Sequence, residues 1–354
     1  MSLFRNLGEV SDTIMGQAPP GEDCNKLGEG TPFVKAGEFG VDRPVIREWT
    51  TKPLKLARRN DVLICVVGAT SGKINKGEDC AIGRSVAAIR AKQDMLDINY
   101  LYFFLKSFSS RLLEMSQGAA QTVITKDMLY FLQIPLPSLP QQQKIANILD
   151  AADALRQNDK ALIAKYDELT QALFLDMFGD VISNSKNWES KKFEEIISFK
   201  RGYDLPNNDR KKGDIPVVAS TGIVGYHNEV KVKGGCIVTG RSGSIGKVQL
   251  ITVDCWPLNT SLYGYQTFNN NLVYLKYFVS YFRIERFSHG AGVPTLDRKL
   301  VHKELAPFPP IELQNQFAER VAVIEEQKAI AQKSIEKSES LFNSLLQKAF
   351  KGEL

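Results

Sequence analysis

Two long stretches of the chain place apolar side chains at three- and four-residue intervals. The first runs from Gln141 to Phe178 without a Gly or Pro inside its repeat, and the second runs from Leu313 to Phe350. This spacing predicts an apolar stripe along one side of a long helix. The stripe positions are Ile145, Ile148, Leu149, Ala152, Leu155, Leu162, Tyr166, Leu169, Leu173 and Met177 in the first stretch, and Phe317, Val321, Ile324, Ala331, Ile335, Leu345, Leu346 and Ala349 in the second. One such helix cannot bury its stripe alone, so we expect the two helices to pack against each other.

A segment of mixed pattern precedes each predicted helix. The first has a β-branched run at Asp61 to Val67 that predicts a buried strand, then a Gly-rich turn at 68–73, and helical spacing over 97–115. The second repeats this plan with a strand at 236–239, a turn at 240–247 and helical spacing over 271–287. Each segment closes with a polar loop, GAAQTVITKDM or GAGVPTLDRKL, and a proline-rich hinge.

The two halves of the chain are in constant register. Gly118, Pro135, Pro137, Ala146 and Phe178 each have an identical residue 172 positions later. A tandem duplication explains this register. The predicted fold class is therefore α+β, with two mixed α/β domains separated by two long antiparallel helices that form a coiled coil. The predicted boundaries are 1–140 and 181–310 for the globular domains, and 141–180 and 311–354 for the helices.

The globular domains and the helices differ in net charge. Residues 191–310 carry 17 basic against 10 acidic side chains, whereas residues 141–190 carry 5 against 8. Basic clusters lie in loop-like sequence, which is typical of a surface that contacts phosphates. These clusters are Lys52, Lys55, Arg58 and Arg59, and then Lys200, Arg201, Arg210, Lys211 and Lys212. The net charge of +5 is also compatible with ordinary solvated lysines.

The sequence contains no recognisable catalytic motif. The turns at 68–73 and 240–247 both lack the spacing and the hydroxyl residue of a phosphate-binding P-loop. The three histidines and five scattered cysteines suggest neither a triad, a zinc site nor a disulfide framework. No GxGxxG motif and no Asn-Pro-Pro-aromatic motif is present, so we expect no enzymatic activity and no cofactor in this chain. The absence of a long apolar run or leader predicts a cytoplasmic protein without a membrane partner.

Several segments of the sequence resemble a known family. NDVLICVVGATSGK, the GxxQT-like loop at 118–122, IPLPSLPQQQKIANILDAAD, GCIVTGRSGSIGK, PFPPIELQNQFAERV and the helix ends at Phe178 to Asp180 and Phe350 to Glu353 are similar to the specificity subunit of type I restriction-modification enzymes. The resemblance covers the whole chain, although Val293-Pro294 replaces the Gln121-Thr122 of the first loop.

The resemblance implies a function for each part of the chain. Each globular domain would be a target-recognition domain that reads one half of an asymmetric, bipartite site in double-stranded DNA. The helices would set the spacing between the half-sites and dock two methyltransferase subunits. Restriction/translocase subunits complete the implied set of partners, and S-adenosylmethionine would be bound by the methyltransferase subunits. The helix length, about 38 residues at roughly 1.5 Å each, limits the distance between outer edges to about 17 base pairs.

Individual contacts follow from residue type and position in the loops. Candidate DNA-binding residues are Lys35, Arg43, Arg47, Lys73, Arg84, Lys126, Tyr203, Asn207, Asn208, Arg210, Tyr226, His227, Arg241, Lys247, Arg298 and Lys299. Candidate residues for packing between the helices are Ile145, Leu149, Leu155, Leu162, Leu169, Leu173, Phe317, Val321, Ile324, Ile335 and Leu345. One alternative remains open, in which the chain is a coiled-coil scaffold that tethers two protein-binding modules without DNA recognition.

Overall fold

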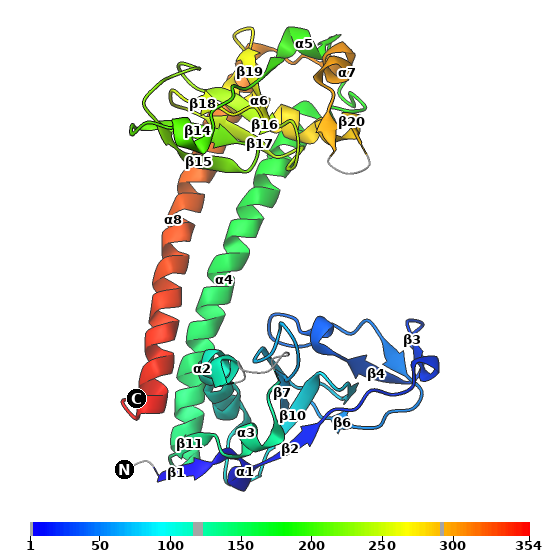
Figure 1. Cartoon of the computed structure of the whole chain (residues 1–354), viewed down its shortest axis with the longest axis vertical. Helices are drawn as coiled ribbons and strands as arrows, with labels where there is room; N and C mark the ends of the chain where they lie inside the picture. The colour runs from blue at the N-terminus through cyan, green and yellow to red at the C-terminus, as the bar shows by residue number, and fades with distance from the viewer. Residues whose placement is uncertain (1–2, 116–122, 291–293) are drawn as a thin grey trace. The chain divides into compact units, whose positions relative to one another are not determined.

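The computed structural model describes residues 3–115, 123–290 and 294–354, and it divides into two compact units. The first unit comprises Met1–Lys160 with Lys333–Leu354, and the second comprises Ala161–Gln332. The two long helices, α4 (Leu139–Phe178) and α8 (Ile311–Lys351), contribute to both units (Figure 1). Each unit therefore contains one globular domain and part of each long helix.

The globular domain of the first unit is built on an antiparallel four-stranded sheet. Its strand order is β2 (Ser11–Met15), β10 (Val86–Ala91), β7 (Asp61–Cys65) and β8 (Ile74–Lys76). A second sheet has the order β3 (Cys24–Asn25), β5 (Trp49–Thr50), β4 (Thr31–Val34), β9 (Cys80–Ile82) and β6 (Leu56–Ala57). A further pair joins β1 (Leu3–Asn6) to β11 (Gln133–Leu136). The helices are α1 (Leu7–Val10), α2 (Ile98–Met115) and α3 (Lys126–Tyr130), with single turns η1 (Gly21–Asp23) and η2 (Ala36–Glu38).

The second unit repeats this plan. Its four-stranded sheet has the order β13 (Ser198–Arg201), β19 (Ser261–Gln266), β16 (Cys236–Gly240) and β17 (Val248–Ile251). The other strands are β15 (Gly222–His227), β14 (Ile215–Ala219) and β18 (Trp256–Pro257) in one sheet, β12 (Ser190–Lys192) with β22 (Leu305–Pro307), and β20 (Ser288–His289) with β21 (Thr295–Leu296). The helices are α5 (Phe193–Ile196), α6 (Leu272–Tyr281) and α7 (Arg298–Lys303), with single turns η3 (Asn207–Asp209) and η4 (Ile284–Phe287). The matching strand orders confirm the predicted tandem duplication, and the two domains differ mainly in the second sheet.

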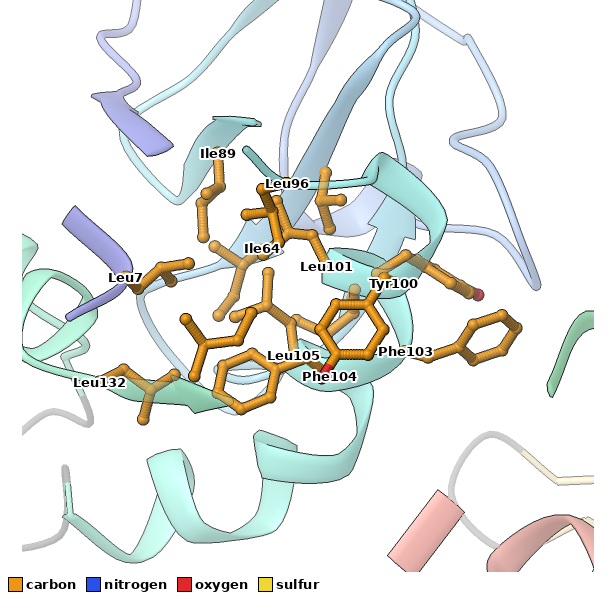
Figure 2. Packing of buried hydrophobic residues seen from close by; sticks show 14 of the residues in the cluster. Leu7, Ile64, Ile89, Leu96, Tyr100, Leu101, Phe103, Phe104, Leu105 and Leu132 are labelled. Atoms are coloured by element: carbon orange, nitrogen blue, oxygen red, sulfur yellow. The ribbon is translucent and has the colours of Figure 1, made fainter. Parts of the chain in front are cut away.

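The core of the first unit forms where α2 covers the four-stranded sheet. Figure 2 shows side chains of α2, among them Leu101 and Leu105, directed at Ile64 of β7 and Ile89 of β10. Tyr100 is fully buried, and its hydroxyl donates a hydrogen bond of 2.8 Å to the carbonyl of Pro135. This bond satisfies the one polar atom that the ring brings into the core.

The core of the second unit is richer in aromatic rings. Phe174 and Phe178 of α4 meet Phe317 of α8 with ring centroids 5.5 and 5.3 Å apart, and Phe178 lies 4.8 Å from Tyr274 of α6. These edge-to-face contacts stabilise the unit beyond the burial of ring surface. They also fix α6 against both long helices.

A buried glutamine at the start of each long helix performs the same task in both units. The side-chain oxygen of Gln142 accepts from the backbone N–H of Asp97, and its amide donates to the carbonyl of Pro137. Gln314, 172 positions later, makes the equivalent bonds to Asn271 and Pro309. Each glutamine thus ties the proline hinge to the residue that begins the domain helix. This explains why the proline-glutamine entry recurs in the sequence.

The line of contact between α4 and α8, here termed the seam, differs from the predicted stripe. The buried and half-buried positions of each helix are spaced alternately three and four residues apart, which is the repeat of a left-handed coiled coil. The seam positions are Gln142, Ile145, Leu149, Ala152, Arg156, Asp159, Ile163, Tyr166, Thr170, Leu173 and Met177 in α4, and Gln314, Phe317, Val321, Ile324, Lys328, Ala331, Ile335, Ser338, Phe342, Leu345 and Ala349 in α8. The α8 set is the α4 set shifted by 172 residues.

Three of the predicted packing residues are therefore wrong. Leu155, Leu162 and Leu169 each precede a seam residue and expose 48, 39 and 50 % of their surface. Polar side chains occupy the middle of the seam instead. The guanidinium of Arg156 lies 4.6 Å from the ring centre of Phe342, and it pairs with Asp153. The guanidinium covers the ring of Phe342, so the two helices pack at this position without a leucine.

The other differences from the sequence prediction concern element ends. The helix predicted over 271–287 stops at Tyr281, because Arg283 adopts a left-handed conformation with φ of +53°, and a single turn follows. Both polar loops contain a short helix, α3 and α7, which Thr125 and Asp297 cap through their side-chain oxygens. Gln121 and Thr122 of the first loop lie outside the described residues.

Within the described part of the chain, no helix is long and apolar enough to cross a membrane.

Candidate nucleic-acid interface

Cationic side chains from several elements of the second unit line one pocket of about 470 Å³. They come from the end of β13, the turn after β16, the end of β20 and the start of α7. The lining residues are Arg201, Arg241, Leu262, His289, Thr295, Leu296, Asp297, Arg298 and Lys299. The structure thus brings together Arg241, Arg298 and Lys299, which sequence reasoning had placed in two separate loops. We term these three the pocket cations.

Backbone bonds fix the pocket cations in place. The N–H of Arg241 donates to the carbonyl of Thr260 at 2.9 Å, and its own carbonyl accepts from the N–H of Leu296 at 2.8 Å. Arg298 and Lys299 begin α7, where the side chain of Asp297 accepts from the N–H of Lys299 at 2.9 Å. The turn after β16 and the start of α7 are therefore joined through β21.

Two of the three guanidinium groups in the pocket have no carboxylate partner among the described residues, whereas the third, that of Arg201, lies 3.5 Å from Asp204. Arg241 reaches only the carbonyl of Asn259 at 3.5 Å, and Arg298 only that of Phe199 at 3.4 Å, among the residues that the structure describes. The one carboxylate in the lining, Asp297, already caps α7. Guanidinium donors without a carboxylate partner match the geometry and charge of a phosphate. The pocket is therefore suited to an oxyanion such as a DNA backbone phosphate.

Replacing all three pocket cations by glutamine is expected to weaken DNA binding without changing the sequence that is read. Phosphate contacts position a protein on the duplex but do not distinguish bases. The slope of log affinity against log salt should fall by up to about one for each contact removed. Titrations of DNA at several salt concentrations would measure this slope. Lys303→Gln, on the same helix but outside the pocket, is the control, and an unchanged slope in the triple variant would remove the pocket from the interface.

The remaining candidates of the second unit lie around β14 and β15. Asn207 and Asn208 are exposed in the single turn η3, and Tyr226 exposes 56 % of its surface on β15. Tyr203 is 37 % exposed, and its hydroxyl lies 2.9 Å from that of Tyr263. Lys247 donates from Nζ to the carbonyl of Thr221 at 2.8 Å, so part of its role is to hold the turn between the two strands.

The structure contradicts the prediction that His227 reads bases. Its side chain is only 3 % exposed, and its ring lies 4.9 Å from the ring of Trp256. Nδ1 of His227 accepts a hydrogen bond of 3.0 Å from the backbone N–H of Lys211. The imidazole is thus a buried part of the domain. The sequence placed Tyr226 and His227 in one polar cluster, but successive side chains of a strand point to opposite faces, so only Tyr226 is exposed.

In the first unit, three of the six candidate cations are tied to acceptors of the protein. Lys35 pairs with Glu48, Arg43 lies 3.9 Å from Glu78 and also reaches the carbonyl of Gly77, and Lys73 donates to the carbonyl of Phe39 at 2.7 Å. The other three are exposed, namely Arg47, Arg84 and Lys126. Carboxylates therefore partly neutralise Lys35 and Arg43, whereas the pocket cations of the second unit have no carboxylate partner among the described residues.

His302 lies on α7 beside the pocket and is a partly buried titratable group. Burial lowers the pKa of His302, and the neighbouring charge of Arg298 lowers it further, against an opposing effect of Glu194. Its Nε2 accepts from the backbone N–H of Phe199 at 3.0 Å, a bond that only the neutral ring can make. A folded pKa below the unfolded value means that the unfolded chain binds more protons in the interval between them.

The free energy of unfolding should therefore decrease as pH falls through the unfolded pKa of about 6.5 toward the lower folded pKa. Thermal unfolding measured between pH 7.5 and pH 5 would show a falling Tm for the natural chain. His302→Gln should flatten this part of the curve, since glutamine does not titrate. An equally steep fall in the variant would assign the pH dependence to other groups.

No group of three or more His, Cys, Asp or Glu side chains among the described residues is placed to hold a metal ion. The five cysteines are free, and four of them are buried. Burial raises the pKa of Cys65 to about 11 and that of Cys80 to about 12, which keeps both thiols protonated.

The sequence matches one protein family along most of its length, and several known proteins along part of it. The profile of the family described as "Type I restriction modification DNA specificity domain" matches residues 3–165 and again 185–339. The specificity subunit of the type I restriction enzyme MjaX of Methanocaldococcus jannaschii is 36 % identical over 157 residues, which cover 43 % of this chain and 37 % of that protein. The EcoBI specificity subunit of Escherichia coli is 26 % identical over 129 residues, covering 34 % and 27 %. Each of these matches spans about a third of the relative's length.

Solved structures show the same fold over the whole chain. The type I restriction-modification S subunit from M. genitalium superposes with a TM-score of 0.62 at 20 % identity, covering 99 % of this chain and 96 % of that one. A chain from a structural study of complex assembly and conformational transition in the type I restriction-modification system gives a TM-score of 0.58 at 16 % identity, covering 99 % and 98 %.

Proposed function

Since the chain belongs to the type I restriction-modification DNA specificity family, with two copies of the family's domain, we propose that it is the sequence-reading subunit of such a complex. Each globular domain reads one half of a bipartite site in double-stranded DNA. The two domains share a scaffold but differ in the second sheet and in their surface cations. The half-sites are therefore unrelated in sequence, which makes the site asymmetric.

The pocket that Arg241, Arg298 and Lys299 line is the observation that best supports DNA binding. Four cationic side chains, the three pocket cations and Arg201, converge on one pocket from segments that are separated by forty residues or more in the sequence. Evenly scattered surface lysines would not produce such a concentration. A phosphate placed there would hold the second domain in register along the duplex while other side chains contact bases.

Methylation and cleavage are assigned to partner subunits in this proposal. The methyltransferase subunits bind S-adenosylmethionine and carry out the transfer, and a restriction/translocase subunit acts on unmodified DNA. This chain contributes the choice of sequence, the spacing between the half-sites and the surface on which the methyltransferase subunits assemble.

The two flanks of the helix pair indicate where those subunits assemble. Side chains directly after a seam residue lie on one flank, where Asp153 contacts Lys106 of α2 at 3.2 Å and Glu325 contacts Tyr277 of α6 at 3.2 Å. Side chains directly before a seam residue lie on the opposite flank. In the second unit these include Leu162, Leu169, Val323 and Ile330, which expose 39, 50, 59 and 56 % of their surface. We term these four residues the apolar flank.

The apolar flank is suited to a helical protein partner. Its members repeat every seven residues on each helix, so a partner helix lying alongside could bury all four. In the second unit the globular domain contacts the flank that carries Glu325, and the four residues of the apolar flank are exposed. We assign the apolar flank to the methyltransferase subunits, the partners that the sequence resemblance implied.

Modification-sensitive sequencing tests the proposed function directly. DNA from cells that make this chain with its methyltransferase partner should carry methyl groups at one interrupted, asymmetric sequence. Cells that make the methyltransferase alone should lack that modification. Methylation without any common sequence would favour the scaffold alternative, in which the chain tethers proteins and does not read DNA.

A further inference from the structure

The strand β15 presents an exposed apolar strip at the edge of a sheet. Ile223, Val224 and Tyr226 expose 52, 42 and 56 % of their surface, and β15 pairs with β14 on one side only. Natural sheets normally protect an edge strand with charged residues, proline or a covering segment. Three large exposed side chains within four residues therefore indicate a surface that another molecule covers.

A bulge turns two of these side chains outward together. The pairing with β14 shifts between Val217 and Val218, which leaves Val224 as the extra residue on β15. Ile223 and Val224 would otherwise alternate between the two faces of the strand. Arg210 braces the bulge, because its Nη1 donates to the carbonyl of Val224 at 3.1 Å. A Cβ atom on Gly225 would lie 3.0 Å from the same nitrogen, so glycine at this position lets the guanidinium approach.

The turn between β14 and β15 is anchored to β17 and to the turn that precedes it. Lys247 holds the carbonyl of Thr221 at 2.8 Å, and the amide of Gln249 donates to the carbonyls of Ala219 and Ser220 at 3.1 and 3.3 Å. Lys247 closes the turn that Arg241 begins. One turn of the second domain therefore carries Arg241 of the pocket at its start and, at its end, Lys247, which contacts the turn that leads into β15.

Charge around the strip favours a polyanion as the molecule that covers it. Arg210, Lys211 and Lys212 lead into β14, and both lysines are exposed. Nε of Arg210 is buried without a hydrogen-bond partner among the described residues. A partner with negative charge at its edges and apolar groups between them matches this arrangement. The major groove of DNA has phosphates at both edges, admits a two-stranded β-ribbon, and presents the methyl group of thymine as its apolar feature.

We propose that β15 reads thymine in the major groove, with Ile223 and Val224 in contact with thymine methyl groups and Tyr226 beside them. The inference rests on the proposed function and deepens it, because it states which base the second half-site contains and how that base is recognised. Arg210 acts here as a positioning residue that holds the bulge, and not as a reader of one base.

Replacing thymine by deoxyuridine tests the proposal, since the substitution removes the methyl group and leaves base pairing intact. The full chain in complex with its methyltransferase subunits would be titrated with duplexes that carry the recognised sequence. Deoxyuridine would replace thymine in one half-site at a time. We expect affinity to fall about four-fold for each methyl group that contacts the strip, and only in the half-site that the second domain reads.

Two variants complete the experiment. Ile223→Ser with Val224→Ser should weaken binding to the thymine duplex and abolish the difference between the two duplexes. Val253→Ser is the control, because Val253 is a valine of the same unit that lies outside the hairpin and exposes 54 % of its surface, close to the 52 % of Ile223, and it should keep the difference.

Equal binding of the thymine and deoxyuridine duplexes would overturn the proposal. A second half-site without thymine, or a double variant that still distinguishes the duplexes, would overturn it as well. In each of these cases sequence-specific binding persists, and the proposed function stands. Loss of all sequence preference in the natural complex would instead refute the proposed function.

Discussion

Inserting seven residues into each long helix should lengthen the spacer of the recognised site while both half-sites keep their bases. The insertions would follow Lys160 in α4 and Gln332 in α8, at the boundary between the two compact units. Seven helical residues add about 10.5 Å, which corresponds to at most about three base pairs. Modification-sensitive sequencing of DNA from cells that make the variant complex would show the new spacer directly.

The seam explains why the insertion has to be seven residues long. Its positions alternate by three and four along both helices, so one added heptad restores the same pairing beyond the insertion. An insertion of two residues in each helix is the control. Two residues rotate the rest of each helix by about 200°, which turns residues such as Ile163 and Ile335 away from the seam and should impair folding. An unchanged spacer in a well-folded heptad variant would show that the helices are not the element that sets the spacing.

The sequence predicted the helices and the duplication because each depends on a strong local pattern. Apolar periodicity without Gly or Pro over 38 residues, and identical landmarks 172 positions apart, require no knowledge of tertiary contacts. The choice of seam was not predictable in the same way. Leu155, Leu162 and Leu169 repeat every seven residues as a seam would, yet Arg156, Ile163 and Thr170 occupy it. Which of these two neighbouring stripes is buried depends on its contacts with the partner helix.

The candidate interface was predictable as a set of residue types but not as a surface. Arg241, Arg298 and Lys299 were found from the repeated loops, whereas their convergence on one pocket depends on the pairing of Ser242 with Thr295. His289 completes that pocket and carries no motif of its own. Ile223 and Val224 were missed because apolar residues in a short strand predict burial, and only the bulge places both outside.

Replacing two residues of the apolar flank by aspartate should abolish assembly with the methyltransferase subunits while the chain itself still folds. Leu169→Asp combined with Val323→Asp removes one apolar side chain from each helix and adds two charges to the proposed contact. A charge buried against an apolar partner costs several kcal/mol, which is enough to prevent a complex of ordinary affinity. Size-exclusion chromatography of the co-expressed subunits would separate the complex from the free chain.

Folding should survive because both side chains are already half exposed or more in the isolated chain. Each aspartate costs at most about 0.7 kcal/mol in helix propensity. The control is Gln171→Asp with Ala329→Asp, which places the same charges directly after seam residues, on the opposite flank, at two other exposed positions. That variant should assemble normally. If the Leu169 and Val323 variant also formed an intact complex, the methyltransferase subunits would have to dock elsewhere, and the apolar flank would lose its assigned role.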